Sequence, residues 1–347
     1  MGKTTLLKKI LENESNFISI TGEDIFIQRI ISSQSIDQLK RFIGNKDLLV
    51  IDEAQEIPNI GINLKLIVDH IQHVRVLVTG SCSFDLANKT GEPLTGRKYT
   101  LKMFPISQIE LSFLEALAET YSNLESRLIF GSYPKIILNT ANEERKSYLY
   151  ELVSSYLLKD ILMFEEVKKS KKMIDLLILI AFQVGKEVSL TDLATNLSIN
   201  KATVERYLDL LEKAFVIVNI RGFSRNLRKE VTKTSRYYFY DNGIRNALIN
   251  NFNSIYQRND IGQLWENYLV SERLKNQEYN SIHSNNYFWR TYDQKEIDWL
   301  EERDGKLYAY EFKWDDKIAK CPKEFKLTYP ESEFKSINTE NYLEFIT

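Results

Sequence analysis

This chain has few cysteines, few histidines and a net charge close to zero, and each of these features limits the class of protein that it can belong to. Its two cysteines, Cys82 and Cys321, lie far apart among 347 residues, which excludes a disulfide framework or a four-cysteine zinc site and suits a reducing compartment. The three histidines form no zinc-binding motif. With 46 basic and 48 acidic residues the net charge is −2, so any nucleic-acid surface must be local.

Long apolar runs and prolines are also rare. The longest apolar run, residues 176–182, is too short to span a bilayer, and the polar, basic start has no leader-like apolar core. We therefore expect a cytoplasmic protein with no membrane partner. Only six prolines occur, there is no internal repeat or low-complexity linker, and this length predicts two or three domains.

The first third of the sequence alternates strand-like and helix-like patterns. Strands are predicted at residues 16–20, 47–55, 74–82 and 99–107, and helices at residues 4–11, 24–33, 35–43 and 60–71. Such alternation is typical of a parallel α/β sheet. A mostly helical stretch follows. Soft boundaries near 145 and 250 divide the chain into residues 1–145, 146–250 and 251–347.

A nucleotide-binding motif is divided between two places in this first third. Residues 2–5 read as the second half of the phosphate-binding loop G-x-x-x-x-G-K-[ST]. Its lysine would neutralise phosphate, its first threonine would face Mg²⁺, and the N–H groups of the following helix would face the phosphates. Asp52 and Glu53 end a predicted strand, where one carboxylate can hold Mg²⁺ and the next can act as a base. The expected cofactors are ATP and Mg²⁺, and the residues expected to bind them are Gly2, Lys3, Thr4, Thr5, Asp52 and Ser81.

Several short motifs then occur in an order that is similar to one protein family. Besides residues 2–5 they are Asp52-Glu53-Ala54-Gln55, Thr79-Gly80-Ser81, Leu94-Thr95-Gly96-Arg97, Pro105-Ile106-Ser107 and Gly131-Ser132-Tyr133-Pro134. With them nearly the whole chain resembles a group of predicted prokaryotic AAA+ ATPases. Members of that group carry a C-terminal winged helix and a domain of unknown function similar to restriction endonucleases.

This resemblance implies several further features. The sheet order would be 5-1-4-3-2, and Arg97 would be an arginine finger that reaches a neighbouring subunit, so a homo-oligomer is expected. A strand and a Gly-x-x-x-x segment would precede Gly2. We therefore interpret the start of the chain as an internal methionine or as the start of a truncated gene.

A winged helix-turn-helix is predicted at residues 188–223, where two amphipathic helices flank the turn Ser198-Ile199-Asn200 and a ribbon follows. Between Arg221 and Arg236 there are six basic residues and one acid, a balance that suits phosphate contacts. The residues expected to contact DNA are Lys201, Thr203, Arg206, Arg225, Arg228 and Lys229, with Asn200 beside them. Winged helices also mediate protein contacts, so a protein partner is the alternative.

Residues 295–314 predict a β-hairpin. Asp304-Gly305 between two strand-like runs is typical of a two-residue turn. With that turn, Asp298 faces Glu311. Ile297 and Trp299 are expected on one face of the hairpin, and the two carboxylates on the other.

The carboxylate face of this hairpin predicts metal chemistry. Directly opposed carboxylates repel, so a cation is expected between them. In restriction-type nucleases such carboxylates hold Mg²⁺, and a lysine, here Lys313, helps to activate water. Glu266 matches an additional glutamate of the subgroup that resembles Holliday-junction resolvases. The alternative is a charged face in a binding domain whose nuclease activity has lapsed.

Together these patterns predict an α/β fold class. It comprises a P-loop AAA+-type parallel sheet whose first strand is missing, a winged helix-turn-helix and a restriction-endonuclease-like α/β domain. The predicted function is that of an ATP-binding ATPase acting on DNA, with a metal-dependent nuclease domain. The predicted catalytic residues are Glu53, Arg97, Glu266, Asp298, Glu311 and Lys313, and the predicted metal ligands are Thr4, Asp52, Glu266, Asp298 and Glu311. The alternatives are a non-catalytic, nucleotide-controlled regulator that binds DNA or protein, and a truncated remnant.

Overall fold

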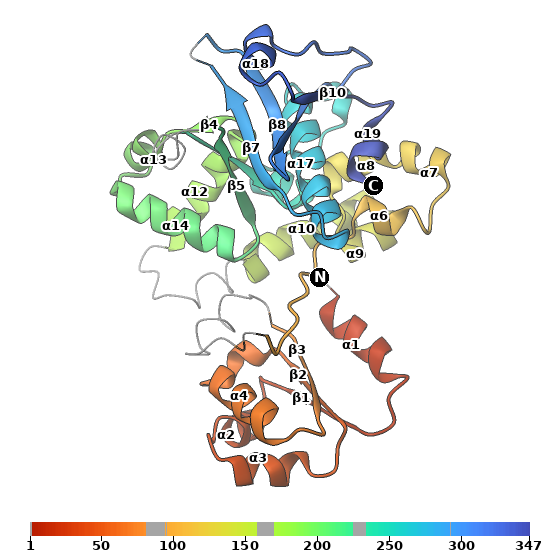
Figure 1. Ribbon diagram of the computed structural model, residues 1–347, viewed down its shortest axis with the longest axis vertical. Helices are drawn as coiled ribbons and strands as arrows, with labels where there is room; N and C mark the ends of the chain where they lie inside the picture. The colour runs from red at the N-terminus through yellow and green to blue at the C-terminus, as the bar shows by residue number, and fades with distance from the viewer. Residues whose placement is uncertain (1, 81–93, 95, 158–169, 225–233, 292) are drawn as a thin grey trace. The chain divides into compact units, whose positions relative to one another are not determined.

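The computed structural model describes every residue except 1, 81–93, 95, 158–169, 225–233 and 292 (Figure 1). It divides into two compact units, Met1–Met103 and Phe104–Thr347. The sequence-based boundaries near 145 and 250 both fall inside the second unit and remain predictions. Among the described helices, none is long and apolar enough to cross a membrane.

The first unit follows the predicted alternation of strands and helices. Its elements are α1 (Lys3–Leu11), β1 (Phe17–Thr21), α2 (Ile25–Ile31), α3 (Ile36–Ile43), β2 (Leu48–Asp52), a 3₁₀ turn (Ala54–Glu56), α4 (Ile60–His70) and β3 (Arg75–Val78). The strands pair in parallel in the order β1-β2-β3. The parallel α/β sheet predicted from the sequence is therefore confirmed for these three strands.

Apolar residues that alternate along β2 build the core of this unit on both faces of the sheet. Leu49 and Ile51 are fully buried in a cluster with residues of α2, α3 and α4. Leu48 and Val50 pack on the other face against Leu7 of α1. Figure 1 shows the same arrangement within this unit, with α1 on one side of the strands and α2–α4 on the other. A strand buried on both faces accounts for the continuous apolar run in the sequence.

The strand predicted at residues 99–107 is wrong. The structure assigns no strand there, and Tyr99 and Leu101 are almost completely exposed. In the expected order 5-1-4-3-2 this segment would pair only with a strand that precedes Gly2, and the described residues contain no such strand. An apolar run without a hydrogen-bonding neighbour cannot form a strand of a sheet.

The second unit is mixed α/β. Its helices are α6 (Gln108–Leu111), α7 (Leu117–Ser122), α8 (Leu124–Phe130), α9 (Pro134–Leu138), α10 (Asn142–Glu151), a π-helical turn (Leu152–Leu157), α12 (Ser170–Phe182), α13 (Leu190–Leu197), α14 (Lys201–Lys213), α16 (Asn242–Leu248), a 3₁₀ turn (Ile255–Gln257), α17 (Ile261–Tyr279), α18 (Lys323–Thr328) and α19 (Tyr342–Ile346). Its strands are β4 (Glu187–Val188), β5 (Ile217–Gly222), β6 (Ser235–Phe239), β7 (Asn285–Arg290), β8 (Glu296–Arg303), β9 (Lys306–Phe312) and β10 (Glu333–Ile337).

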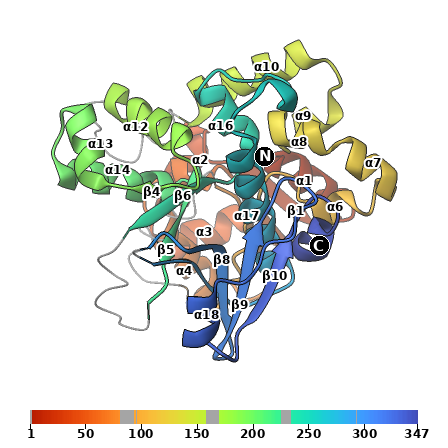
Figure 2. The same ribbon diagram turned by 90° about the horizontal axis from the view of Figure 1, so that it is seen from above.

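One sheet runs through the described part of this unit, in the order β10-β9-β8-β7-β5-β6-β4. Strands β4–β6 come from the segment predicted as a winged helix, and β7–β10 from the segment predicted as nuclease-like. The two parts join where β5 pairs in parallel with β7, with Arg221 opposite Tyr287. Figure 2 shows α12–α14 gathered beside β4–β6. Helix α18 packs on β7–β9 through Phe325. The sheet therefore brings residues of both segments together at one site.

Candidate nucleotide site and acid cluster

The half-loop of the sequence forms the start of α1. Gly2 has a φ of 86°, in the left-handed region that glycine adopts without strain. The ammonium group of Lys3 donates a hydrogen bond to the carbonyl of Gly80, just after β3. Thr4 and Thr5 are exposed in the first turn, where the backbone N–H groups of a helix have no intrahelical acceptor. This turn therefore presents a lysine, two hydroxyls and N–H groups beside the ends of the strands.

Asp52, the last residue of β2, receives three hydrogen bonds on its carboxylate. Thr4 Oγ1 donates at 2.9 Å and the backbone N–H of Glu53 at 3.2 Å. The hydroxyl of Thr79, just after β3, also donates to it. Mg²⁺ prefers such hard oxygen donors. The predicted pair Thr4 and Asp52 therefore lies together, and its role in holding Mg²⁺ stays a prediction.

Glu53 is held in a left-handed backbone conformation, with a φ of 51°. Such a conformation costs a non-glycine residue on the order of 1–3 kcal/mol. A Cβ atom at Gly22 would overlap the Glu53 carbonyl oxygen, and the Gly22 N–H donates to the Asp52 carbonyl at 2.7 Å. The Gln55 amide donates to the Glu53 carboxylate at 2.5 Å. The sequence analysis missed Gly22, although a glycine two residues after a predicted strand is the feature that could have identified it.

Two other residues predicted for this site are Ser81 and Arg97. Ser81 lies outside the described residues, and Thr79, two positions earlier, is the residue that contacts Asp52. Arg97 forms an ion pair with Asp69 of α4, and its side chain is 54% exposed. The predicted role of Arg97 toward a neighbouring subunit stays a prediction.

Helices α13 and α14 flank the turn that the sequence predicts. Ser198 has a φ of 52° and ends α13, and the Asn200 side chain accepts a hydrogen bond from the Thr203 N–H at 2.7 Å. Asn200 is therefore the N-cap of α14, and its predicted position facing a nucleic-acid groove stays a prediction. Lys201 and Arg206 are exposed on α14, and Thr203 is half-buried.

The charges exposed on α14 are nearly balanced. Lys201 lies 3.7 Å from Glu205, and Lys213 pairs with Asp209 at 2.6 Å. The three basic residues predicted in the ribbon, Arg225, Arg228 and Lys229, lie outside the described residues. The described part of the segment thus offers lysine and arginine side chains, without a continuous basic surface.

The predicted hairpin of β8 and β9 is confirmed. Asp304 and Gly305 form its turn, with φ values of 49° and 78°, as a type I′ turn requires. The paired residues run from Arg303 with Lys306 to Trp299 with Tyr310, in the predicted register. The regular pairing ends there, and the Asp298 carboxylate accepts a hydrogen bond from the Phe312 N–H at 2.9 Å.

A register shift changes the faces of β8. Pairing of β8 with β7 is irregular between Tyr287 and Trp289, as at a β-bulge. Ile297 therefore shares a buried cluster with Leu300, whereas Trp299 donates to Glu301 at 2.8 Å. The expectation that Ile297 and Trp299 share one face is wrong, because simple alternation ignores an extra residue in the strand.

The predicted nuclease residues gather near the start of α17 and the end of β9. The Tyr238 hydroxyl donates to Glu266 at 2.6 Å, and Lys313 donates to Glu311 at 2.8 Å. Burial, together with the charges of Glu266 and Glu311, raises the pKa of Asp298 well above its usual range. The four predicted residues Glu266, Asp298, Glu311 and Lys313 form the acid cluster, with Glu296 at its edge.

Arg236 is the component of this cluster that the sequence analysis missed. It was counted among the basic residues of the ribbon, yet it is 4% exposed on β6. Its guanidinium lies 2.7 Å from Glu296, 3.5 Å from Glu266 and 3.8 Å from Asp298. Burial raises the pKa of Glu266 although Arg236 and Tyr238 oppose that shift. In the described part of the chain, no group of three or more Asp, Glu, His or Cys residues could hold a metal ion.

A second buried acid, Asp241, contacts the Gly-Ser-Tyr-Pro motif, which lies far from it in sequence. Its carboxylate accepts hydrogen bonds from the Ser132 N–H at 2.7 Å and from the Ile244 N–H at 3.2 Å. A Cβ atom at Gly131, whose φ is 74°, would overlap this carboxylate. The contact gives the Gly-Ser-Tyr-Pro motif a structural role, because the glycine allows the loop to approach Asp241 closely.

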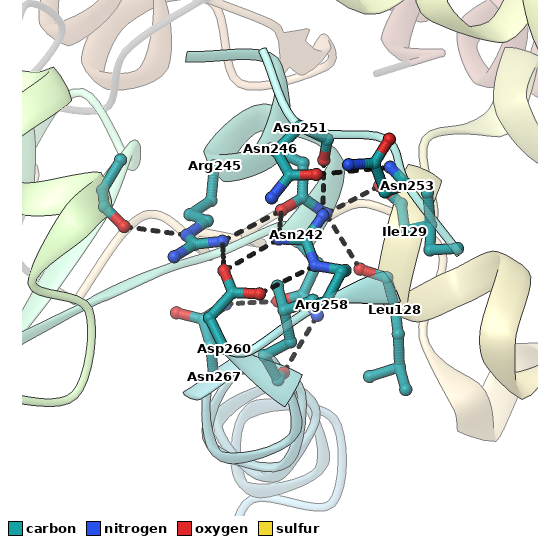
Figure 3. A network of polar contacts seen from close by, with 12 residues as sticks. Leu128, Ile129, Asn242, Arg245, Asn246, Asn251, Asn253, Arg258, Asp260 and Asn267 are labelled. Atoms are coloured by element: carbon teal, nitrogen blue, oxygen red, sulfur yellow. Dashed lines mark hydrogen bonds and ion pairs between the residues drawn. The ribbon is translucent and has the colours of Figure 1, made fainter. Parts of the chain in front are cut away.

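A buried polar network lies next to Asp241 in sequence (Figure 3). Asp260 accepts from Arg245 at 2.5 Å and from two nitrogens of Arg258 at 2.8 Å. Asn246 donates to the carbonyls of residues 128 and 129 in α8. Burial by itself would raise the pKa of Asp260, but hydrogen bonds from Arg258 and Arg245 lower it overall. The network joins α8, α16 and the start of α17.

The first unit has the features of a P-loop-like AAA domain: a parallel sheet, a helix that begins at a Gly-Lys-Thr-Thr run, and an Asp-Glu pair at the tip of a strand. Residues 1–112 match the family model described as AAA domain. Residues 121–254 match a domain of unknown function (DUF8612), and residues 261–341 match a domain of unknown function (DUF4143).

Similar proteins occur in bacteria and archaea. The chain is 26% identical over 318 residues to the uncharacterized protein Rv2008c of Mycobacterium tuberculosis. This match covers 90% of the chain and 68% of that protein. It is 26% identical over 252 residues to an uncharacterized protein of Haemophilus influenzae, and the match covers 67% of this chain and 58% of that protein. It is 24% identical over 323 residues to the uncharacterized protein MJ1544 of Methanocaldococcus jannaschii, and the match covers 86% of this chain and 69% of that protein. No solved structure matches the chain.

Proposed function

We propose that the chain is an AAA-type ATPase that binds magnesium and ATP at the start of α1. The observation that carries this proposal is the hydrogen bond of 2.9 Å between the Thr4 hydroxyl and the Asp52 carboxylate. It joins the two halves of a nucleotide-binding motif that lie 48 residues apart in sequence. The match of residues 1–112 to an AAA domain supports the proposal.

Each side chain of this site has a distinct task. Lys3 supplies positive charge to the phosphates, and Thr4 and Asp52 hold the magnesium ion. Magnesium, when bound, neutralises charge that develops on the transferred phosphoryl group. Glu53 orients the attacking water, while Gln55 fixes its carboxylate through the hydrogen bond of 2.5 Å.

Binding of a fluorescent ATP analogue in the presence of Mg²⁺ tests the proposal. Lys3→Ala and Asp52→Asn should each weaken binding by roughly 10-fold or more, because each removes a charge-assisted contact. Lys8→Ala, an exposed lysine in the last turn of the same helix, is the matched control. Equal affinities of wild type and Lys3→Ala would refute the assignment. Because residues 2–5 match only the second half of the loop, a chain extended upstream by a strand and Gly-x-x-x-x should bind more tightly.

Phosphate release separates an ATPase from a nucleotide-controlled switch. Glu53→Gln keeps the size of the side chain and removes its charge, so it should retain binding and abolish hydrolysis. A wild-type chain that binds ATP and releases no phosphate would instead favour the regulator.

DNA is the partner that we propose for residues 170–239. Their order of elements is α12, β4, α13, α14, β5 and β6, with β4 and β5 paired antiparallel to β6. A winged helix-turn-helix has this order, and its second helix, here α14, enters the major groove. A protein partner is the competing possibility, because the exposed charges of α14 are nearly balanced. DNA cleavage is not part of the proposed function, because the contacts of the acid cluster do not fit a metal ion.

A further inference from the structure

The centre of the acid cluster is filled by a side chain of the protein itself. The Arg236 guanidinium faces Glu266, Glu296 and Asp298 at 2.7–3.8 Å. The guanidinium carbon lies over the ring of Phe288, 4.4 Å from the ring centroid. The Arg236 side chain is 5% exposed, so this contact is built into the core of the unit.

The carboxylate oxygens around Arg236 also have donors of their own. Glu266 accepts from Tyr238, Asp298 accepts from the backbone N–H of Phe312, and Glu311 accepts from Lys313. A divalent metal ion requires several oxygen lone pairs that converge on one point at roughly 2.0–2.6 Å. Here the lone pairs point to N–H and O–H donors, and the predicted metal site does not fit its ion.

Two atoms of the cluster, Arg236 Nε and Glu311 Oε2, are buried and have no hydrogen-bond partner among the described residues. The other oxygen of Glu311 pairs with Lys313. Loss of Arg236 would leave Glu266 and Asp298 without their shared cation beside Glu311 Oε2. Breaking a buried ion pair by removing one partner leaves an uncompensated charge, which a metal ion is able to neutralise.

We propose that Arg236 is the resident cation of the acid cluster and that it excludes divalent metal ions from the wild-type chain. It stands in the place where the carboxylates of a restriction-type nuclease would hold a metal. Because Arg236 belongs to β6 while its partners belong to α17 and β8, it also ties the α12–β6 segment to the C-terminal part of the sheet. The carboxylates are therefore a structural ion-pair centre in this chain.

Manganese binding to the full chain tests this proposal. Every chain in this test carries Asp52→Asn and is free of nucleotide, because the proposed magnesium site would itself take up Mn²⁺. Titration of Mn²⁺, followed by electron paramagnetic resonance of the free ion and by the melting temperature, should show no binding to the chain that retains Arg236. Arg236→Met keeps an unbranched apolar stem and removes the charged guanidinium group, so this variant should bind Mn²⁺ and melt at a higher temperature with the ion than without it. Arg236→Lys keeps a cation and should behave like the chain that retains Arg236.

A refolding experiment tests the same proposal if the Arg236→Met chain is too unstable to be isolated in its folded state. Mn²⁺ added during refolding should then restore the native tryptophan fluorescence of the variant, and Glu311→Gln in the same background should abolish that rescue. Mn²⁺ binding to the Asp52→Asn chain that retains Arg236, or an Arg236→Met chain that neither binds Mn²⁺ nor is rescued by it, would overturn the proposal.

Discussion

Replacing Asp241 by asparagine should change the pH dependence of folding stability. Asp241 is buried and accepts hydrogen bonds from the backbone N–H groups of Ser132 and Ile244. Burial raises the pKa of Asp241 to about 6, although these hydrogen bonds and the charge of Lys275 oppose the shift. In the unfolded chain the carboxyl keeps its ordinary pKa of 3.8.

The sign of the effect follows from these two pKa values. Between about pH 4 and pH 6 the folded state binds the proton of Asp241 more tightly than the unfolded state does, so protonation stabilises the fold. This contribution is complete below the unfolded pKa and is lost as the pH rises through 6. Its full size is roughly 3 kcal/mol, from a difference of about two pKa units. About 2 kcal/mol of it falls between pH 4.5 and pH 7.5.

Asparagine cannot titrate, so the variant lacks this contribution at every pH. Its amide group also places a donor opposite one of the two backbone N–H groups, which adds a loss of about 1–3 kcal/mol that does not depend on pH. The difference in unfolding free energy between wild type and Asp241→Asn should therefore grow by roughly 2 kcal/mol as the pH falls from 7.5 to 4.5.

Urea unfolding followed by tryptophan fluorescence measures this difference. All four tryptophans lie in the second unit, so the fluorescence reports on the unit that contains Asp241. Asp293→Asn, which makes the same chemical change at an exposed residue, is the control and should run parallel to the wild type. Parallel curves for wild type and Asp241→Asn would refute the reasoning.

Three further predictions concern other contacts. Gly131→Ala should destabilise the second unit by more than about 2 kcal/mol, because a left-handed residue alone costs roughly 1–2 kcal/mol and the methyl group would overlap the Asp241 carboxylate. Gly262→Ala is the control, and because open space surrounds it, it should be neutral or stabilising in the same urea assay. Asp260→Asn should cost on the order of 3–5 kcal/mol in that assay, since it leaves two buried arginines without their carboxylate, and a loss below about 1 kcal/mol would contradict this view. Replacing Lys201 and Arg206 together by alanine should weaken binding to duplex DNA and reduce the salt slope, measured by fluorescence anisotropy, by roughly 2; an unchanged slope would instead favour a protein partner for α14.

Much of the first unit and one hairpin could be predicted from sequence, because their determinants are local. The helix and strand boundaries of residues 3–78 agree with the apolar periodicity to within a few residues. The turn at Asp304-Gly305 fixed the register of β8 and β9, since only a few residue types adopt positive φ at both positions. Thr4 and Asp52 were recognised as partners because the motif prescribes both residue types.

The acid cluster was predicted only in part, because its cation comes from a distant strand. Nothing near Arg236 in sequence distinguishes it from the other basic residues of the ribbon. Its burial depends on β5 pairing with β7, which brings the α12–β6 segment against α17 and β8. Charge counting along the chain placed Arg236 among the basic residues that suit phosphate contacts, whereas the sheet placed it among Glu266, Glu296 and Asp298.

The sequence by itself determined the strand–helix alternation of the first unit, the nucleotide motif and the β8–β9 turn, because backbone preferences and short motifs act over a few residues. The tertiary structure alone decided that one sheet joins two predicted domains, that Asp241 holds the loop at Gly131, and that an arginine neutralises the acid cluster. The physical reason is that burial and ion pairing depend on which distant segments pack together, and that packing has no local signature in the sequence.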